Sequence, residues 1–394
     1  MDFKLTEEQL MIQDVARRIA QDKIAPSAEH HDATGEFPLD NIRTLGENGL
    51  MGIEVPAEYG GAGMDPISYV LAMIEIAAAD AAHSTIMSVN NSLFCNGILK
   101  YGTEEQKQLY VRAIAEGREI GAFALTEPQS GSDATAMRCK AVKREDGTWV
   151  INGKKSWITS GPVAKYIVLF ALTDPTAGAR GITAFMIDTS KPGFHKGKTE
   201  PKLGIRASDT AVITFTDCRV PAEDLLGSPE VDVKQGFAGA MATFDNTRPL
   251  VAAMAVGCAR ASLDLTRDLL EQAGVEIDYD KPAQLQPAAA ATFLRLEAEW
   301  EAARLLTLQA AWLADNRKPN SLEASMAKAK AGRVGTEVTL SCVELCGAVG
   351  YAEGELLENW ARDSKILDIF EGTQQIQQLI VARRLLGLSS AQLK

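Results

Sequence analysis

The sequence predicts an α+β protein in which a central β domain separates two helical domains. Helical patterning fills residues 1–119, short β-rich runs occupy residues 120–229, and the helical period returns over residues 230–394. A chain of 394 residues is also too long for one ordinary core, because a domain holds roughly 100 to 200 residues. We therefore expect three domains with these bounds.

The first domain contains two signals for the start of a helix. Thr6 with Gln9, and Thr103 with Gln106, have the spacing of capping boxes, in which side chains satisfy the free amides of a first helical turn. Between them, the glycine-rich segment 59–65 interrupts the pattern before another apolar helix.

The second domain is predicted from short runs of β-branched and aromatic residues. Residues 166–173 and 181–187 are two such runs, bounded by Gly, Pro and Asp. Apolar and threonine side chains alternate over residues 212–216, which is typical of a strand with one buried face. Asn152 and Gly153 predict a hairpin turn, since both residues tolerate positive φ.

The third domain contains an apolar stripe with the three- and four-residue intervals of one helix face. Its members are Phe293, Leu296, Trp300, Ala303, Leu306, Ala310 and Leu313. Such a stripe favours a core or a subunit interface over a cofactor site.

Composition and charge exclude several function classes. Apolar residues make up 46% of the chain and charged residues 23%, the proportions of a packed globular protein. The formal net charge of −12 disfavours nucleic acid and anionic membranes as partners. No apolar run approaches the roughly 18 residues of a membrane span, and the N-terminus is acidic where a signal peptide would be basic. We expect a cytoplasmic protein without membrane insertion. The histidines and cysteines show no metal-ligand spacing, so no metal site is expected.

Glu371 is a candidate base. It follows the apolar Ile369 and Phe370, and Gly372 and Thr373 then open a helix. A carboxylate in apolar surroundings has a raised pKa, because desolvation penalises its charged form, and this makes it a better base near neutral pH. Taken alone, a solvated glutamate before a helix cap is the more common arrangement.

Three further segments carry polar side chains suited to a ligand. Residues 125–133 form a polar turn beside the first strands, and Trp157 stands next to hydroxyl residues that could hydrogen-bond a flat heterocycle. Arg248 stands at the head of an apolar helix. By itself, Trp157 is more readily explained as a core residue, and Arg248 is equally well explained as a surface arginine.

Taken in order, seven segments resemble the acyl-CoA dehydrogenase family, and the similarity covers essentially the whole chain. The segments are residues 59–65, 125–128 with 131–133, 157–159, 202–206, 215–221, 244–249 and 370–373. One would be a weak signal, whereas seven in register are a strong one. The resemblance implies an N-terminal α-helical domain, a central β-barrel domain and a C-terminal four-helix-bundle domain.

The resemblance also implies residue roles around a flavin cofactor, FAD. Thr126 and Thr159 hydrogen-bond the flavin ring, Trp157 packs beside it, and Ser132 lies where FAD meets the pantetheine arm of the substrate. Thr373 and Gln375 take FAD-contacting positions at the start of the last helix.

On the substrate side, the resemblance makes Glu371 the base, with Gly372 beside it, while Asp245 and Arg248 orient the coenzyme A arm. The implied reaction is α,β-dehydrogenation of an acyl-CoA thioester to the trans-2-enoyl-CoA, as in fatty acid β-oxidation, with the β-hydride passing to flavin N5. An electron-transferring flavoprotein would receive the electrons. An acyl-CoA oxidase-like enzyme, distinguished by peroxide formation, is an alternative, and the length and type of the acyl chain stay open.

The sequence departs from the family pattern in two places. Members usually carry an Arg-x-x-Phe-Gly segment that reaches the FAD of a neighbouring subunit, and residues 271–280 replace it here. Glu344 stands where a glutamine contacting the neighbour's FAD is common, and Ala348 and Val349 are also unusual. Both departures concern contacts between subunits. We therefore expect either a homotetramer or a heterotetramer in which a paralogous subunit completes the flavin site.

Overall fold

The computed structural model describes residues 4–227, 236–389 and 392–393, and for residues 236–246 it describes the backbone alone. The N-terminal helices are α1 (Glu7–Ile19), α2 (Ala25–Thr34), α3 (Leu39–Glu47), α4 (Pro66–Ala79), α5 (Ala81–Ser88), α6 (Asn96–Tyr101), α7 (Glu104–Gln106) and α8 (Arg112–Ala115). A π-helical segment, η4 (Val89–Cys95), joins α5 to α6. Both predicted capping boxes are confirmed, at Thr6 with Gln9 and at Thr103 with Gln106.

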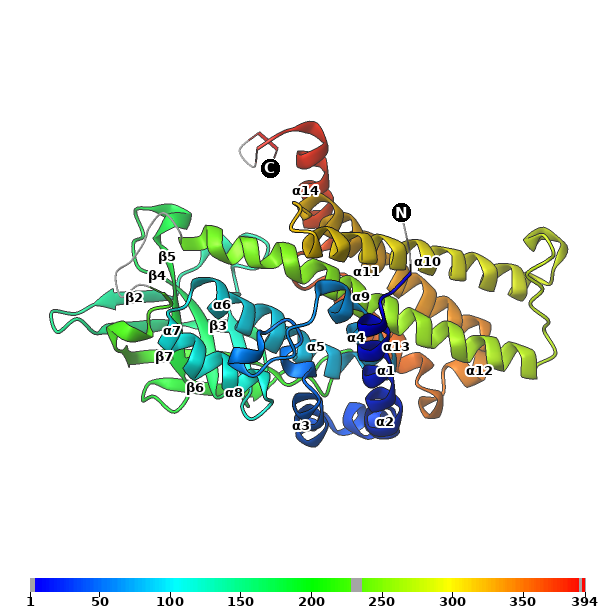
Figure 1. Ribbon diagram of the computed structural model, residues 1–394, viewed down its shortest axis with the longest axis horizontal. Helices are drawn as coiled ribbons and strands as arrows, with labels where there is room; N and C mark the ends of the chain where they lie inside the picture. Colours follow the sequence, from blue (N-terminus) through cyan, green and yellow to red (C-terminus); the bar gives the residue numbers. More distant parts are fainter. Residues whose placement is uncertain (1–3, 228–235, 390–391, 394) are drawn as a thin grey trace.

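Seven strands form one curled sheet, seen beside the N-terminal helices in Figure 1. They are β1 (Gly121–Ala124), β2 (Lys140–Lys143), β3 (Trp149–Thr159), β4 (Tyr166–Leu172), β5 (Ile182–Asp188), β6 (Phe194–Thr199) and β7 (Thr210–Val220). The strand order is β1-β4-β2-β3-β7-β6, and β5 pairs with β4. All seven lie within the predicted central domain, whose bounds at residues 120 and 229 stay predictions.

The predicted hairpin turn at Asn152 and Gly153 is wrong. Both residues lie inside β3, at a register shift against β7. The side chain of Asn152 donates to Asp217 Oδ1 at 3.0 Å and accepts from the Asp217 backbone amide at 2.8 Å, which fixes the irregularity. A Cβ atom at position 153 would lie 2.6 Å from Cys139, so the glycine serves close packing of strands rather than a turn.

The C-terminal part is helical, as predicted. Four of its helices, α9 (Gly236–Gln272), α10 (Ala288–Asp315), α11 (Ser321–Leu345) and α13 (Leu357–Leu367), pack together, with the short α12 (Gly347–Gly350) between α11 and α13. The last helix, α14 (Gln374–Leu386), packs on α11 and extends away from the body of the molecule (Figure 1). Thr247–Gln272 of α9 is long and apolar enough to span a membrane, but 78% of its apolar window is buried within the protein.

The two helical domains share one hydrophobic core. Buried side chains of α1, α4 and α5 form a single cluster with those of α9, α10, α11 and α13, and four residues of the predicted apolar stripe, Phe293, Leu296, Ala303 and Ala310, belong to it. A buried ion network reinforces this contact, because Glu75 of α4 accepts hydrogen bonds from Arg260 of α9 at 2.8 Å and from Arg17 of α1 at 3.1 Å. The sheet has its own core, and a further buried cluster joins β4 and β5 to the N-terminal helices.

Candidate active site

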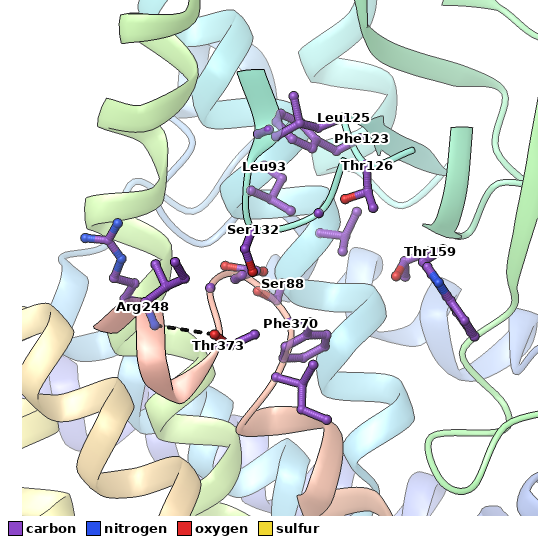
Figure 2. A pocket seen from close by; sticks show the side chains of 18 of the residues that line it. Ser88, Leu93, Phe123, Leu125, Thr126, Ser132, Thr159, Arg248, Phe370 and Thr373 are labelled. Carbon is purple, nitrogen blue, oxygen red and sulfur yellow. Dashed lines mark hydrogen bonds between the residues drawn. The ribbon is translucent and has the colours of Figure 1, made fainter. Parts of the chain in front are cut away.

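A cavity of about 460 Å³ lies where the two helical domains meet the sheet. Five parts of the chain line it: α5 with η4, β1 with the loop that follows, the end of β3, the middle of α9, and the turn leading into α14. Arg248 therefore lies inside α9 rather than at the head of a helix. Figure 2 shows Thr126 and Thr159 on one side of this cavity and Arg248 on the opposite side.

Most of the residues singled out in the sequence meet in this cavity. Those that line it are Thr126, Ser132, Trp157, Thr159, Arg248, Glu371, Gly372 and Thr373. Gln375 is exposed on α14 and is not among the lining residues, so its predicted contact with FAD stays a prediction. Asp245 lies outside the residues whose side chains are described.

Glu371 stands in a turn with an unusual backbone. Its φ is +54° and that of Gly372 is +101°. The residue as a whole is half-buried, but its Oε2 atom is buried and has no hydrogen-bond partner among the described residues. Buried polar atoms are ordinarily paired. An unpaired carboxylate oxygen on the wall of a cavity therefore marks a position where a ligand could contact it.

The pKa of Glu371 is raised to about 7. Burial is the largest cause, since it penalises the charged carboxylate. A hydrogen bond from the Thr247 side chain lowers the pKa, as do the positive charges of Lys328 and Arg248, but they do not cancel the effect of burial. A carboxyl group with this pKa is half ionised near neutral pH and can accept a proton there.

Thr373 caps the helix that follows this turn. Its hydroxyl accepts a hydrogen bond from the Ile376 amide at 3.4 Å, drawn as the dashed line in Figure 2. The predicted cap is therefore confirmed. Gly372 is required at its position, because a Cβ atom there would lie 2.4 Å from Gln377 Nε2 and because its φ disfavours other residues.

The opposite wall presents hydroxyl groups and an aromatic ring. Trp157 is 61% exposed and has a φ of +60°, so the explanation of this residue as part of the core is wrong. An exposed indole held in a strained backbone conformation beside Thr126 and Thr159 suits a flat heterocycle that can stack and accept hydrogen bonds. The residues present therefore fit the isoalloxazine ring of a flavin on this side.

A buried ion pair anchors this wall. Lys155, which is fully buried in β3, donates to Glu127 Oε1 at 2.8 Å and to the carbonyl oxygen of Leu125 at 2.9 Å. Glu127 also accepts from the backbone amides of Arg138 and Cys139. The loop that carries Thr126 is thereby fixed on both sides to the strand that carries Thr159.

Arg248 is buried rather than exposed, so its explanation as a surface residue is wrong. It is 8% exposed, and its Nη1 atom lies 3.4 Å from Ser325 Oγ on α11. It also contributes positive charge at Glu371.

Sequence reasoning missed Ser88, Lys328 and Gln377. Ser88 and Gln377 line the cavity, and each has a buried side-chain oxygen without a hydrogen-bond partner among the described residues. Lys328 is a fully buried lysine whose Nζ atom donates to the carbonyl oxygen of Gly372 at 2.5 Å. One signal was available, because Lys328 shares a helix face with Ala324, Ala327 and Ala331, which are small residues typical of close packing.

Three family models together match nearly the whole chain. They are the acyl-CoA dehydrogenase N-terminal domain over residues 6–118, the middle domain over residues 122–218 and the C-terminal domain over residues 234–386.

Individual proteins resemble the chain along most of its length. An acyl-CoA dehydrogenase of Bacillus subtilis is 41% identical, and the alignment covers 97% of this chain and 99% of the relative. The mitochondrial short-chain specific acyl-CoA dehydrogenase of Mus musculus is also 41% identical, over 97% of this chain and 91% of its own.

Two solved structures have the same fold over nearly their full lengths. Butyryl-CoA dehydrogenase from Megasphaera elsdenii has a TM-score of 0.90 and 37% identity, covering 98% of this chain and 100% of that one. A glutaryl-CoA dehydrogenase from Mycobacterium smegmatis in complex with FADH2 has a TM-score of 0.89 and 27% identity, covering 98% and 96%.

The buried ion pair predicts a stability effect. Replacing Lys155 with Met should lower the free energy of unfolding by about 3 to 5 kcal/mol, because the buried Glu127 carboxylate loses its cation. Urea unfolding of the FAD-loaded protein measures this. The control is Lys154→Met, the same substitution at the exposed neighbouring position. Equal, small effects of the two substitutions would contradict the structural role of the pair.

Proposed function

Because the chain belongs to the acyl-CoA dehydrogenase family, we propose that Glu371 is the base that removes the α-proton of a short-chain acyl-CoA thioester. The chain is an FAD-dependent oxidoreductase that dehydrogenates acyl-CoA thioesters. One observation carries the assignment of the base: Glu371 places a buried carboxylate oxygen without a hydrogen-bond partner among the described residues on the cavity, with a pKa of about 7.

The residues of this chain would divide the reaction between two walls of the cavity. FAD, when bound, supplies the acceptor for the hydride that leaves the β-carbon with its electron pair. Thr126, Thr159 and Trp157 would hold the flavin, and Glu371 would take the α-proton, so that the two C–H bonds are replaced by the Cα–Cβ double bond. Ile369 and Phe370 line the cavity beside the base and would exclude water from it when FAD and substrate are bound, which would strengthen the electrostatic interactions of the carboxylate.

Glu371→Gln tests the assignment of the base directly. The amide keeps the shape of the side chain but cannot accept the proton, so turnover should fall by about 1,000-fold or more, within the range of general-base effects. Flavin absorbance per chain and acyl-CoA binding should be retained. Near-normal turnover would show that another group removes the proton.

The acyl chain is proposed to be short. Val89, Leu93, Phe123 and Met254 give the cavity an apolar wall for an alkyl chain, and the mouse relative and the Megasphaera structure are named for short-chain and butyryl substrates. Butyryl-CoA should therefore have a kcat/KM at least about 10-fold above that of octanoyl-CoA, which corresponds to about 1.4 kcal/mol. A higher kcat/KM with octanoyl-CoA would contradict this proposal.

Arg248 is proposed to bind the substrate rather than the flavin, because it lies across the cavity from Thr126 and Thr159 (Figure 2). Arg248→Ala should weaken the binding of an enoyl-CoA product by about 10-fold, as expected for the loss of one contact to a charged group. Flavin content should change little. Equal losses of enoyl-CoA affinity and of flavin content would count against this role.

We propose that electrons leave to an electron-transferring flavoprotein. Peroxide formed in stoichiometric amounts under air would instead favour the oxidase-like alternative. The cytoplasmic location expected from the sequence stays a prediction.

The altered segment 271–280 bears on the assembly. Its basic neighbours have carboxylate partners within the chain, since Arg267 lies 2.6 Å from Glu297 and Lys281 lies 2.8 Å from Asp278. These pairs compete with any contact to a neighbour's cofactor. We therefore propose that a paralogous subunit supplies the missing arginine, and the homotetramer is the alternative.

Flavin content tests this proposal. The chain purified alone should contain less than one FAD per chain, because a charge-assisted contact contributing about 1.5 to 3 kcal/mol is missing. Co-expression with a paralogous subunit should restore the flavin. One tightly bound FAD per chain with full activity in the chain alone would rule out the heterotetramer.

A further inference from the structure

Two buried side chains hold the turn that carries Glu371. Lys328 reaches the turn from α11 and donates to the carbonyl oxygen of Gly372 at 2.5 Å. Gln377, from the first turns of α14, donates to the same oxygen at 3.1 Å and to the carbonyl oxygen of Glu371 at 3.3 Å. Both side chains are essentially fully buried. Two carbonyl groups that the turn leaves outside regular structure are therefore satisfied by side chains from two different helices.

The backbone of this turn needs such support. Glu371 has a φ of +54°, a left-handed conformation that a glutamate adopts only where its surroundings impose it. Burying a lysine is also costly unless its ammonium group is paired. The strained backbone of Glu371 and the buried ammonium group of Lys328 lie next to each other. This indicates that the contact between Lys328 and the turn has a role beyond packing.

We propose that Lys328 is a positioning residue for proton removal: with Gln377 it fixes the direction of the Glu371 carboxylate, and its charge favours the ionised form of that carboxylate. This inference depends on the proposed role of Glu371 as the base. Lys328 acts through the backbone of the turn and through its electric field, and it is not proposed to contact the reacting atoms.

The charges around Lys328 support this role. Glu371 and Asp368 face it from the turn and from the end of α13, and Arg248 faces it from α9. Burial lowers the pKa of Lys328 to about 8, although the two carboxylates oppose this effect. Below about pH 8 the ammonium is present, and above about pH 7 the carboxylate of Glu371 is present. Both charges coexist mainly in the interval between these values, where the pair is suited to act.

The experiment compares Lys328→Met with Lys330→Met in the FAD-loaded enzyme. Lys330 lies on the same helix, is half-buried and pairs with Glu299, so it is a matched control outside the cavity. Removing the charge at position 328 should raise the pKa of Glu371. The pKa of Glu371, about 7, places the acid limb of the wild-type kcat/KM profile near pH 7 as an expectation. In Lys328→Met this limb should therefore move upward by about one pH unit.

Turnover at a pH above this limb should also fall, by about 10-fold or more, with a smaller change in KM, because the base is misdirected. Lys330→Met should change neither quantity. Gln377→Leu removes hydrogen bonds to the same turn without removing a charge. It should lower turnover and leave the midpoint in place, which separates the positioning effect from the electrostatic effect.

A second readout does not depend on turnover. The carboxyl band that disappears from the infrared spectrum in Glu371→Gln can be followed against pH in the wild-type and Lys328→Met holoenzymes, and its midpoint should shift in the same direction. An unchanged midpoint in both measurements, with only a loss of thermal stability, would overturn the inference. Normal turnover in Glu371→Gln would instead overturn the proposed function, so the two failures are distinguishable.

Discussion

A carboxyl group that is buried and can still ionise is the constraint on which the rest of this structure depends. At Glu371, burial raises the pKa, while a hydrogen bond from Thr247 and the charges of Lys328 and Arg248 lower it. These groups belong to α9 and α11, and the base itself lies between α13 and α14. The pKa of Glu371 therefore depends on the C-terminal helices being packed in this one register.

The sheet side of the cavity is rigid for a comparable reason. There, Lys155 and Glu127 are buried together, and Glu127 accepts hydrogen bonds from two backbone amides. Each wall thus places a lysine against backbone carbonyls next to a group with a proposed role, Thr126 on one wall and Glu371 on the other. Groups that are fixed before the substrate binds need no reorganisation during the reaction, which is the physical source of electrostatic catalysis.

Local signals in the sequence predicted what depends on local contacts. The capping boxes and the Thr373 cap need only a spacing of three residues, and the structure confirms them. The hairpin at Asn152 and Gly153 failed because the glycine is required by its close contact with Cys139, the residue before β2. Lys328 was missed because its partners are 40 or more residues away, and a lysine in a helix is ordinarily solvated.

The segment that differs from the family pattern, residues 271–280, is fixed by weaker interactions than the turn that carries Glu371. Lys281 is 58% exposed, and its pair with Asp278 lies near the surface, where such ion pairs contribute about 0 to 1 kcal/mol. A partner could therefore recruit or replace these charges at little cost to the fold. The contact between Lys328 and Gly372 is buried and cannot be exchanged in this way. Assembly can consequently diverge in this protein while the geometry around Glu371 stays fixed.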